Sequence, residues 1–287
     1  MSSQITTAFV QQYSNNVQML SQQKGSLLRS VVDSETVRGK NSFFDQVGVA
    51  TAQKRVSRHS DTPQIDTPHS RRRVSLVDYE YADLIDNADR IRTLIDPTSS
   101  YALAAAYAMG RAMDDEIIAA ISGTAYTGET GSTSTPLPVA QKITEASTGG
   151  LTLDKLRNAK QILDLADVDP SLPRHMVISP KGLSDLLNNT TITSSDYNTI
   201  KALVQGELNT FMGFNFIVSN RLSLASNKRL NLAFVGDGVK LALGQDVVTR
   251  IDERADKGYS TQVYVSMSMG AVRMEEVKCV TIESYEA

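Results

Sequence analysis

The longest helical pattern in the sequence runs from Asp96 to Gly123, and no other segment constrains the fold as strongly. Asp96 is a good N-cap and Pro97 suits the first helical turn. Gly110 is the only helix breaker before Gly123. Small or apolar residues recur at intervals of three and four, as on one face of a helix: Leu103, Ala106, Gly110, Met113, Ile117 and Ile121. We therefore expect one long amphipathic helix over residues 97–122.

Two features of this helix predict partners outside it. Ala104, Ala105, Ala106, Ala108 and Gly110 make its first half thin, so another element can approach closely. Asp114, Asp115 and Glu116 lie in its C-terminal half, where the helix dipole disfavours acidic side chains. We expect these acids to have a basic partner that comes from elsewhere.

Residues 1–42 are rich in Gln, Ser, Asn and Thr, with scattered apolar side chains. The segment is too polar to form a core of its own and too apolar for a simple tail. We interpret it as an arm that lies along neighbouring protein, with a disordered terminus as the alternative. Its apolar residues are Phe9, Val10, Tyr13, Val17, Met19 and Leu20.

Residues 43–95 have the pattern of a long hairpin, with a turn-rich tip around Thr62-Pro63 and Thr67-Pro68. Its charge is uneven: residues 54–73 hold six basic residues and two acids, whereas residues 74–96 hold six acids and two arginines. We expect a basic projection and an acidic base. Because side chains alternate between the faces of a strand, Arg71 and Arg73 should share one face and Arg72 the other.

The remainder of the chain alternates between helical and strand patterns, which indicates the α+β class. A second helix should begin at Thr152 and end before Asp169-Pro170. We expect strands at His175–Ser179 and Asn215–Ser219 and a helix at Pro180–Asn189. Strands Leu230–Val235 and Val239–Leu243 flank Gly236-Asp237-Gly238, which has the composition of a hairpin turn.

No residue pattern in the sequence indicates catalysis, a cofactor or a metal. Cys279 is the only cysteine, so no disulfide can form within the chain, and we expect it to be a buried small hydrophobe. His59, His69 and His175 lie on separate elements without metal-ligand spacing. The net charge of −3 leaves no surplus of Lys and Arg for duplex binding. Without a signal peptide or a membrane span, we expect a soluble protein that is made in the cytoplasm and is not an enzyme.

The order of these parts resembles the major capsid proteins of tailed phages, which have the Hong Kong 97-type fold. Leu151–Asp164 and Arg174–Leu187 are similar to the opening of that family's axial domain. Thr210–Leu222 resembles its Gly-(Phe/Tyr)-x-Val strand, and Ala233–Gly244 resembles the hairpin that leaves the domain. Gly258–Ile282 resembles the closing strand pair of its peripheral domain.

The resemblance implies an N-terminal arm (1–45), an extended β-hairpin loop (46–82), a peripheral domain (83–150) with its spine helix (97–122), an axial domain (151–245), and peripheral return strands with the C-terminus (246–287). It implies hexamers and pentamers in an icosahedral shell around double-stranded DNA, which the shell contacts weakly and without sequence specificity. A separate scaffolding protein and a portal are expected, since the chain starts with the arm at Met1. The protein should be found in the virion after assembly in the host cytoplasm.

The candidate residues for subunit contacts are Phe9, Tyr13, Met19, Leu20, Arg71, Arg72, Arg73, Asp114, Asp115 and Glu116. We expect the apolar residues of the arm to bury against an adjacent subunit. We further expect Arg71 and Arg73 to face acids of a neighbour, with Asp114, Asp115 and Glu116 as leading candidates. The alternative is a solvated basic loop, because charge runs usually face water.

Three other functions remain open at the level of sequence. The shell of an encapsulin-like bacterial nanocompartment shares the fold, although the polar segment 1–42 argues mildly against it. A hydrolase-like α/β enzyme would need a pocket that gathers titratable side chains. A tail or neck protein would form rings or tubes instead of closed shells.

Overall fold

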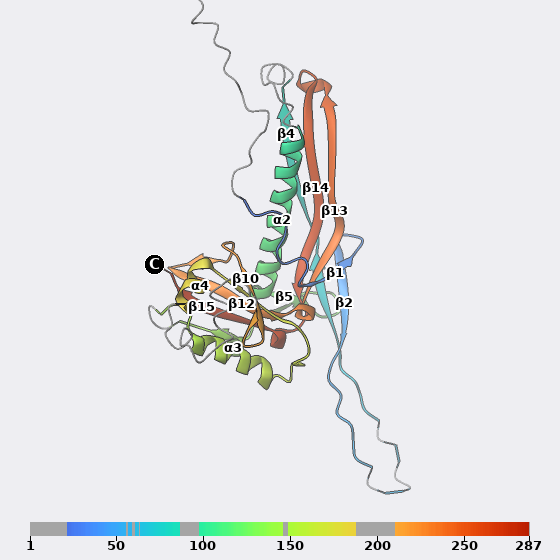
Figure 1. The fold of residues 1–287 in the computed structure, drawn as a ribbon. Helices are drawn as coiled ribbons and strands as arrows, with labels where there is room; N and C mark the ends of the chain where they lie inside the picture. Colours follow the sequence, from blue (N-terminus) through green and yellow to red (C-terminus); the bar gives the residue numbers. More distant parts are fainter. Residues whose placement is uncertain are drawn as a thin grey trace, which may run out of the picture. The chain divides into compact units, whose positions relative to one another are not determined.

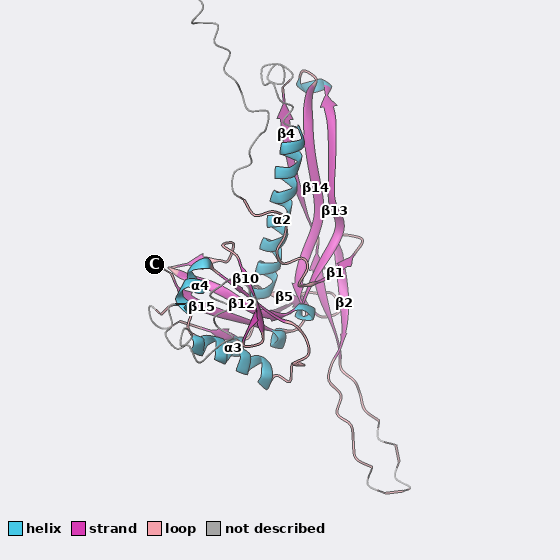
Figure 2. Ribbon diagram, in the orientation of Figure 1, coloured by secondary structure: helices cyan, strands magenta, loops and turns pink. Residues whose placement is uncertain are grey.

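The computed structural model describes residues 22–55, 57–58, 61–62, 64–86, 98–145, 149–187 and 210–286. Helices and strands are mixed along these residues, so the chain is α+β as the sequence predicted (Figure 2). The described residues form two compact units: the first contains residues 22–26, 78–111 and 245–267, and the second contains residues 27–77, 112–244 and 268–286. Helix α2 (Thr98–Ser122) and strands β13 (Val239–Arg254) and β14 (Ser260–Arg273) contribute to both units.

The second unit contains a seven-stranded sheet in the order β7-β15-β12-β8-β10-β9, with β11 paired to β12. Its strands are β7 (Lys142–Ile143), β8 (Arg174–Ile178), β9 (Thr210–Phe211), β10 (Phe214–Val218), β11 (Leu224–Ala225), β12 (Lys228–Val235) and β15 (Cys279–Tyr285). Strand β8 is buried along its whole length, with β10 parallel on one side and β12 antiparallel on the other. The sequence predicted β8 and β10 within one residue at each end.

Helices α3 (Leu153–Leu165) and α4 (Pro180–Leu187) pack beside this sheet (Figure 1). The Thr152 side chain accepts a hydrogen bond from the backbone N–H of Lys155, which is the N-cap that starts α3. Leu156 and Leu163 of α3 are fully buried in one core with residues of β8, β10 and α4. The predicted helices in this region are therefore confirmed.

The predicted hairpin around Gly236-Asp237-Gly238 is wrong. These residues form a 3-10 turn, but β12 enters the seven-stranded sheet and β13 enters a different, four-stranded sheet. A Cβ on Gly236 would lie 2.7 Å from the carbonyl oxygen of Val31, and the carbonyl of Gly238 accepts from Met274 N–H at 2.8 Å. The two glycines let the chain pass close to Val31 on one side and to Met274 on the other. A glycine pair that serves such a close approach cannot be told from a hairpin turn by its local sequence.

The four-stranded sheet has the order β1-β13-β14-β4, with β1 at Asp33–Thr36 and β4 at Val77–Ile85. Helix α2 spans the predicted helix, and Asp96 and Pro97 lie outside the described residues. Its buried stripe runs every fourth residue: Ala105, Met109, Met113, Ile117 and Ile121. The prediction for Leu103 is wrong: its side chain is 50% exposed, because it lies two positions before Ala105 and so points to the other side of the helix. No helix among the described ranges is long and apolar enough to cross a membrane.

A small sheet in the order β2-β3-β5-β6 forms the base of the predicted hairpin. Its strands are β2 (Asn41–Val47), β3 (His69–Ser75), β5 (Ala125–Thr127) and β6 (Thr133–Thr135). Strands β2 and β3 are antiparallel and pair Phe44 with Arg72, which confirms the hairpin. The return limb is two strands instead of one, because the chain leaves this sheet at Leu76 and continues as β4 in the four-stranded sheet.

The last two strands do not form the closing pair predicted over Gly258–Ile282. Strand β14 lies between β13 and β4, whereas β15 pairs with β12 and with β7 in the seven-stranded sheet. Both strands are strongly apolar, and burial pattern alone does not tell which sheet each one joins. The division of the chain into arm, loop, peripheral and axial domains stays a prediction.

Residues 22–40 pack on their own chain, so the prediction that residues 1–42 lie along neighbouring protein is wrong for this part. Leu28, Val32 and Val37 are buried, and β1 pairs with β13 in parallel. The Asp114 carboxylate accepts the backbone N–H groups of Leu27 and Leu28 at 3.1 Å. These buried contacts give the segment a place in the subunit's own core.

The beginning of this segment, at Gln22 and Gly25, packs closely against α2. A Cβ on Gly110 would collide with the backbone of Gly25, so the predicted thin helix is confirmed at this position. Arg111 Nη1 donates to the side-chain oxygen of Gln22 at 3.0 Å. Glycine is therefore required at position 110, because backbone atoms of another segment occupy the space that a Cβ atom would need.

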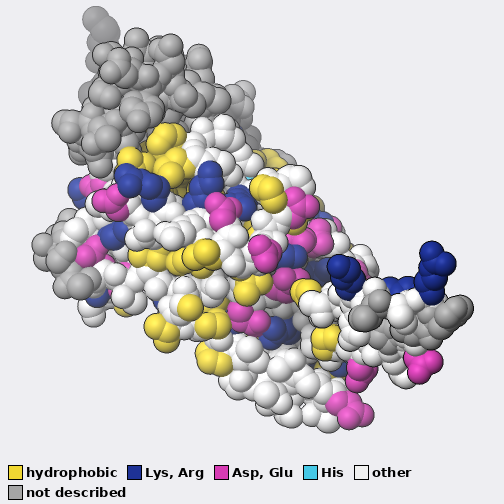
Figure 3. All heavy atoms as spheres, turned by 90° about the horizontal axis from the view of Figure 1, so that it is seen from below, with side chains coloured by type: hydrophobic (Ala, Val, Ile, Leu, Met, Phe, Trp, Pro, Cys, Tyr) yellow, Lys and Arg dark blue, Asp and Glu magenta, His cyan; other side chains and the backbone are white. Residues whose placement is uncertain are grey.

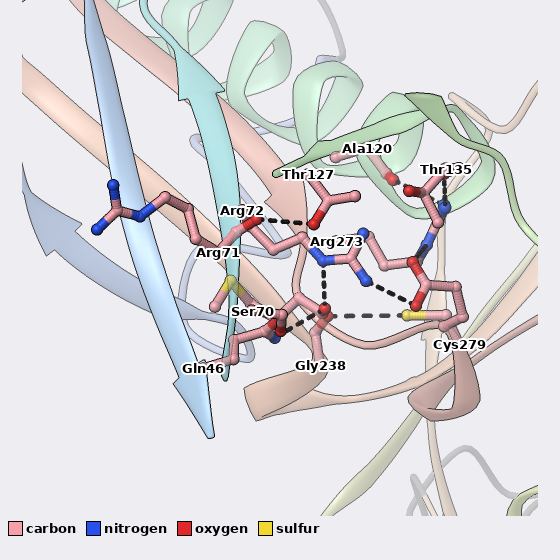
Figure 4. A network of polar contacts seen from close by, with 12 residues as sticks. Gln46, Ser70, Arg71, Arg72, Ala120, Thr127, Thr135, Gly238, Arg273 and Cys279 are labelled. Carbon is pink, nitrogen blue, oxygen red and sulfur yellow. Dashed lines mark hydrogen bonds and ion pairs between the residues drawn. The ribbon is translucent and has the colours of Figure 1, made fainter. Parts of the chain in front are cut away.

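The fully buried Arg273, the last residue of β14, binds the C-terminal end of α2 (Figure 4). Its Nη1 donates to the carbonyls of Ile121 at 2.9 Å and Gly123 at 2.7 Å, and its Nη2 donates to the carbonyl of Thr135 at 2.9 Å. The last turn of α2 contains no basic residue. Arg273 thus supplies from another strand both the hydrogen bonds and the positive charge that a helix C-terminus favours.

Replacement of this arginine should weaken the second unit strongly. We expect Arg273→Met to lower the free energy of unfolding by about 3 kcal/mol or more, because several buried carbonyls lose their donors. Arg254→Met is the matched control, since Arg254 is only partly buried and its side chain bonds Asp256 and Gln262 instead of a helix end. Urea unfolding of both variants measures the difference, and equal stabilities would contradict the role given to Arg273.

Replacing the adjacent acids Asp114 and Asp115 of α2 should also change the free energy of unfolding by different amounts. Asp114→Ala leaves the N–H groups of Leu27 and Leu28 without their acceptor, and we expect a loss of about 2–4 kcal/mol. Asp115 is partly exposed, and Asp115→Ala should cost less than about 1 kcal/mol. Thermal and urea unfolding test this contrast, and a larger effect at Asp115 would refute it.

Candidate subunit interface

The three arginines of β3 divide between the two faces of the small sheet. Figure 4 shows Arg71 and Arg72 pointing to opposite sides of β3. Arg72 is buried and donates to the carbonyl of Met274 at 3.0 Å and to the Glu276 carboxylate at 2.7 Å. The predicted alternation is confirmed. The prediction of Arg72 as a subunit contact gains no support, because Arg72 is buried and its guanidinium bonds Met274 and Glu276 of its own chain.

The outer face of the small sheet carries Arg71 and Arg73 over aromatic rings. Arg71 Nε donates to Asp45 at 2.7 Å, and its guanidinium lies 5.4 Å from the centre of the Phe43 ring. The Arg73 guanidinium lies 4.9 Å from the Tyr126 ring. The hydrogen bond from Arg71 lowers the pKa of the Asp45 carboxyl. Exposed arginine and aromatic side chains on one face have the composition of protein contact surfaces.

The three predicted acidic partners have different surroundings. Asp114 is buried beneath residues 27 and 28, so its predicted role opposite a neighbour's Arg71 and Arg73 is wrong. Asp115 forms a two-bond ion pair with Arg221, which confirms the expected basic partner from outside the helix. The contacts predicted for Glu116, Arg71 and Arg73 with a neighbour stay predictions. Phe9, Tyr13, Met19 and Leu20 lie outside the described residues.

The two limbs that extend from β2 and β3 carry exposed apolar side chains, which the sequence reading did not single out. Figure 2 shows these limbs as loops beyond the strands. Val47, the last residue of β2, is 69% exposed, and Val49 and Ile65 on the limbs are 91% and 41% exposed. Lys54 and Arg55 are exposed on the same limb as Val49. The space-filling view of Figure 3 shows hydrophobic, basic and acidic side chains interspersed on one face of the molecule. Exposed valines beside basic residues favour contact with another protein.

The described residues show no arrangement for metal chemistry, because no group of three His, Cys, Asp or Glu side chains gathers among them. Cys279 is fully buried, as predicted, and burial raises the pKa of its thiol to about 12. His175 is nearly buried beside the ring of Phe234, and burial lowers its pKa. Both side chains are part of the packing.

Comparison with known proteins identifies the family. Residues 5–286 match the family model described as phage capsid protein. The structure resembles the capsid structure of cyanophage P-SCSP1u, with a TM-score of 0.76 and 18% identity over 99% of this chain and 95% of that one. It also resembles the capsid of Ralstonia phage GP4, with a TM-score of 0.75 and 12% identity over 98% and 96%.

A third similar structure is the capsid of a native GTA particle, with a TM-score of 0.72 and 11% identity over 99% of this chain and 97% of that one. Among curated proteins, none matches the sequence. The fold is thus the capsid fold that the resemblance implied. The match to the family model over nearly the whole length shows that this chain belongs to the phage capsid protein family and is a structural subunit of a phage shell.

Proposed function

We propose that the chain is the major capsid protein of a tailed phage, and that it assembles through hexamers and pentamers into an icosahedral shell around double-stranded DNA. The family match over residues 5–286 is the observation that carries this proposal. Val47 at the end of β2 and Val49 on the limb that follows support it, because their exposed apolar side chains offer surface that another subunit would cover.

The charge of the chain fits a wall that encloses DNA without binding it tightly. With a net charge of −3 the protein has no excess of cations to neutralise phosphates, so contacts with packaged DNA should be weak and independent of sequence. We propose a purely structural role without enzymatic activity. A separate scaffolding protein and a portal would complete the shell, which would be assembled in the host cytoplasm and persist in the virion.

Two surfaces are proposed as subunit contacts. The outer face of the small sheet presents Arg71 and Arg73 with Phe43 and Tyr126. The apolar residues Phe9, Tyr13, Met19 and Leu20 of the N-terminal segment would bury against an adjacent subunit. An encapsulin-like nanocompartment remains the second candidate by fold, and it is not favoured, since the matching family model describes phage capsid proteins. The content of purified particles separates the two: DNA and a portal, or a protein cargo.

Assembly is the direct test. The expressed protein, supplied with a scaffolding protein where needed, should give capsomers or closed shells by light scattering and in electron micrographs. Shells form because each subunit leaves apolar and charged surface that only other copies cover. A stable monomer under all conditions of salt, concentration and scaffolding would overturn the proposal, and open tubes or rings would indicate a tail or neck protein.

A further inference from the structure

A small cavity lies where the small sheet, the end of α2 and the end of β14 meet. It is lined by residues 73–75 of β3, residues 124–126 at the start of β5, residues 271–273 of β14 and Ala120 of α2. All of these residues belong to the second unit. The cavity has a volume of about 170 Å³, less than the roughly 300–1,000 Å³ of a pocket for a drug-sized molecule. Its size suits a small ion with a few waters.

The lining of this cavity carries positive charge. Arg73 and Arg273 are its charged side chains, and the described residues that line it include no Asp or Glu. Arg273 is fully buried and donates to backbone carbonyls, which are neutral, so its charge is felt in the cavity. A cavity with two guanidinium groups and no carboxylate attracts an anion.

Arg73 differs from the other two arginines of β3 in having no anionic partner. Arg71 pairs with Asp45 and Arg72 pairs with Glu276. The guanidinium of Arg73 forms no hydrogen bond or ion pair with any residue that the structure describes, and its Nε is shielded from solvent without an acceptor. A buried N–H without an acceptor costs free energy, and an anion at this guanidinium would offset that cost.

The side chain of Arg73 is held in one position although it has no such partner. A Cβ on Gly131 would lie 2.6 Å from Cβ and 2.7 Å from Cδ of Arg73, so the turn at Gly131 packs directly on the stem of the arginine. The N–H of Gly131 donates to the carbonyl of Gly128 at 3.0 Å, which closes this turn. The ring of Tyr126 lies 4.9 Å from the guanidinium. An arginine fixed in this way loses little conformational entropy when it binds a ligand.

The available donors favour an anion with several oxygens. A guanidinium whose face lies on a ring keeps its edge for two oxygens of one anion, as in arginine–phosphate pairs. Thr124 also lines the cavity, and its hydroxyl forms no hydrogen bond within the described part of the chain. A tetrahedral oxyanion has a third oxygen for this hydroxyl, whereas chloride is a single atom and cannot accept from both sides of the guanidinium fork and from Thr124 in this way.

We propose that this cavity binds one inorganic oxyanion of the size of phosphate or sulfate, which Arg73 and the hydroxyl of Thr124 hold. The site goes beyond the shell-forming role, because every group that lines it belongs to a single chain. The bound anion neutralises Arg73 and joins β3 to the residue that follows the end of α2. Because the anion binds the folded subunit, it also stabilises the second unit against unfolding.

Equilibrium dialysis of unassembled subunits against radiolabelled inorganic phosphate tests the site, since no neighbouring copy then competes for Arg73. At constant ionic strength, the parent should bind about one phosphate per chain, which sulfate displaces and chloride does not. Arg73→Met should bind phosphate at least roughly tenfold more weakly, as expected for the loss of hydrogen bonds to a charged group. Arg71→Met is the matched control, because Arg71 lies on the same face of β3 and is already paired with Asp45. It should bind phosphate like the parent.

A second variant tests the cavity while Arg73 stays in place. Thr124→Val removes one hydroxyl from an exposed residue with little change of shape, so its circular dichroism should match that of the parent. We expect it to bind phosphate severalfold more weakly, and phosphate should raise its melting temperature less than that of the parent. The inference is overturned by a parent that binds no phosphate in excess of chloride, by an equal loss of binding in Arg71→Met and Arg73→Met, or by parent-like binding in Thr124→Val.

Discussion

The buried guanidinium of Arg273 is the contact on which the second unit depends. It ends β14, and its donors reach carbonyls at the end of α2 and in β6. The neighbouring residue Met274 accepts from Arg72 of β3 and donates to Gly238 between β12 and β13. Two adjacent residues thus tie the end of the long helix, the small sheet and the passage between the two larger sheets. Because a buried arginine is stable only with its partners in place, this junction favours one arrangement of the surrounding elements.

Several charged side chains form their hydrogen bonds and ion pairs within the subunit. The groups that can contact other subunits therefore lie at the periphery. Asp114 binds backbone N–H groups of the N-terminal segment, Asp115 pairs with Arg221, and Arg72 pairs with Glu276. By contrast, Val47 at the end of β2 and Val49, Lys54 and Arg55 on the limb that follows are exposed. Among the described residues, β1 pairs with only four residues of the β13 edge that faces it. Asp114, Asp115 and Arg72 therefore have their partners within the subunit. In our proposal, a neighbouring copy covers the exposed groups at the periphery.

Local signals in the sequence predicted the local structure well and the long-range contacts poorly. Helix α3 with its Thr152 cap, the buried strand β8 and the alternation of Arg71 and Arg72 follow from periodicity and capping, which act over a few residues. The Gly236-Asp237-Gly238 turn was recognisable, but which sheet each flanking strand enters depends on segments far away in the chain. The acids of α2 were recognised as needing partners. Those of Asp114 are backbone groups of residues 27 and 28, which carry no signature in the sequence.

In our proposal, assembly covers residues 47–55 of each subunit with a neighbouring copy, and digestion with trypsin measures this directly. Lys54, Arg55 and Arg58 are exposed cleavage sites in the single chain. Mass spectrometry of timed digests gives the cleavage rate at each site, in unassembled subunits and in shells at equal protein concentration. We expect cleavage after Lys54 and Arg55 to be fast in subunits and at least tenfold slower in shells. Equal rates in the two forms would contradict it, because the limb would then remain in solvent after the shell has closed.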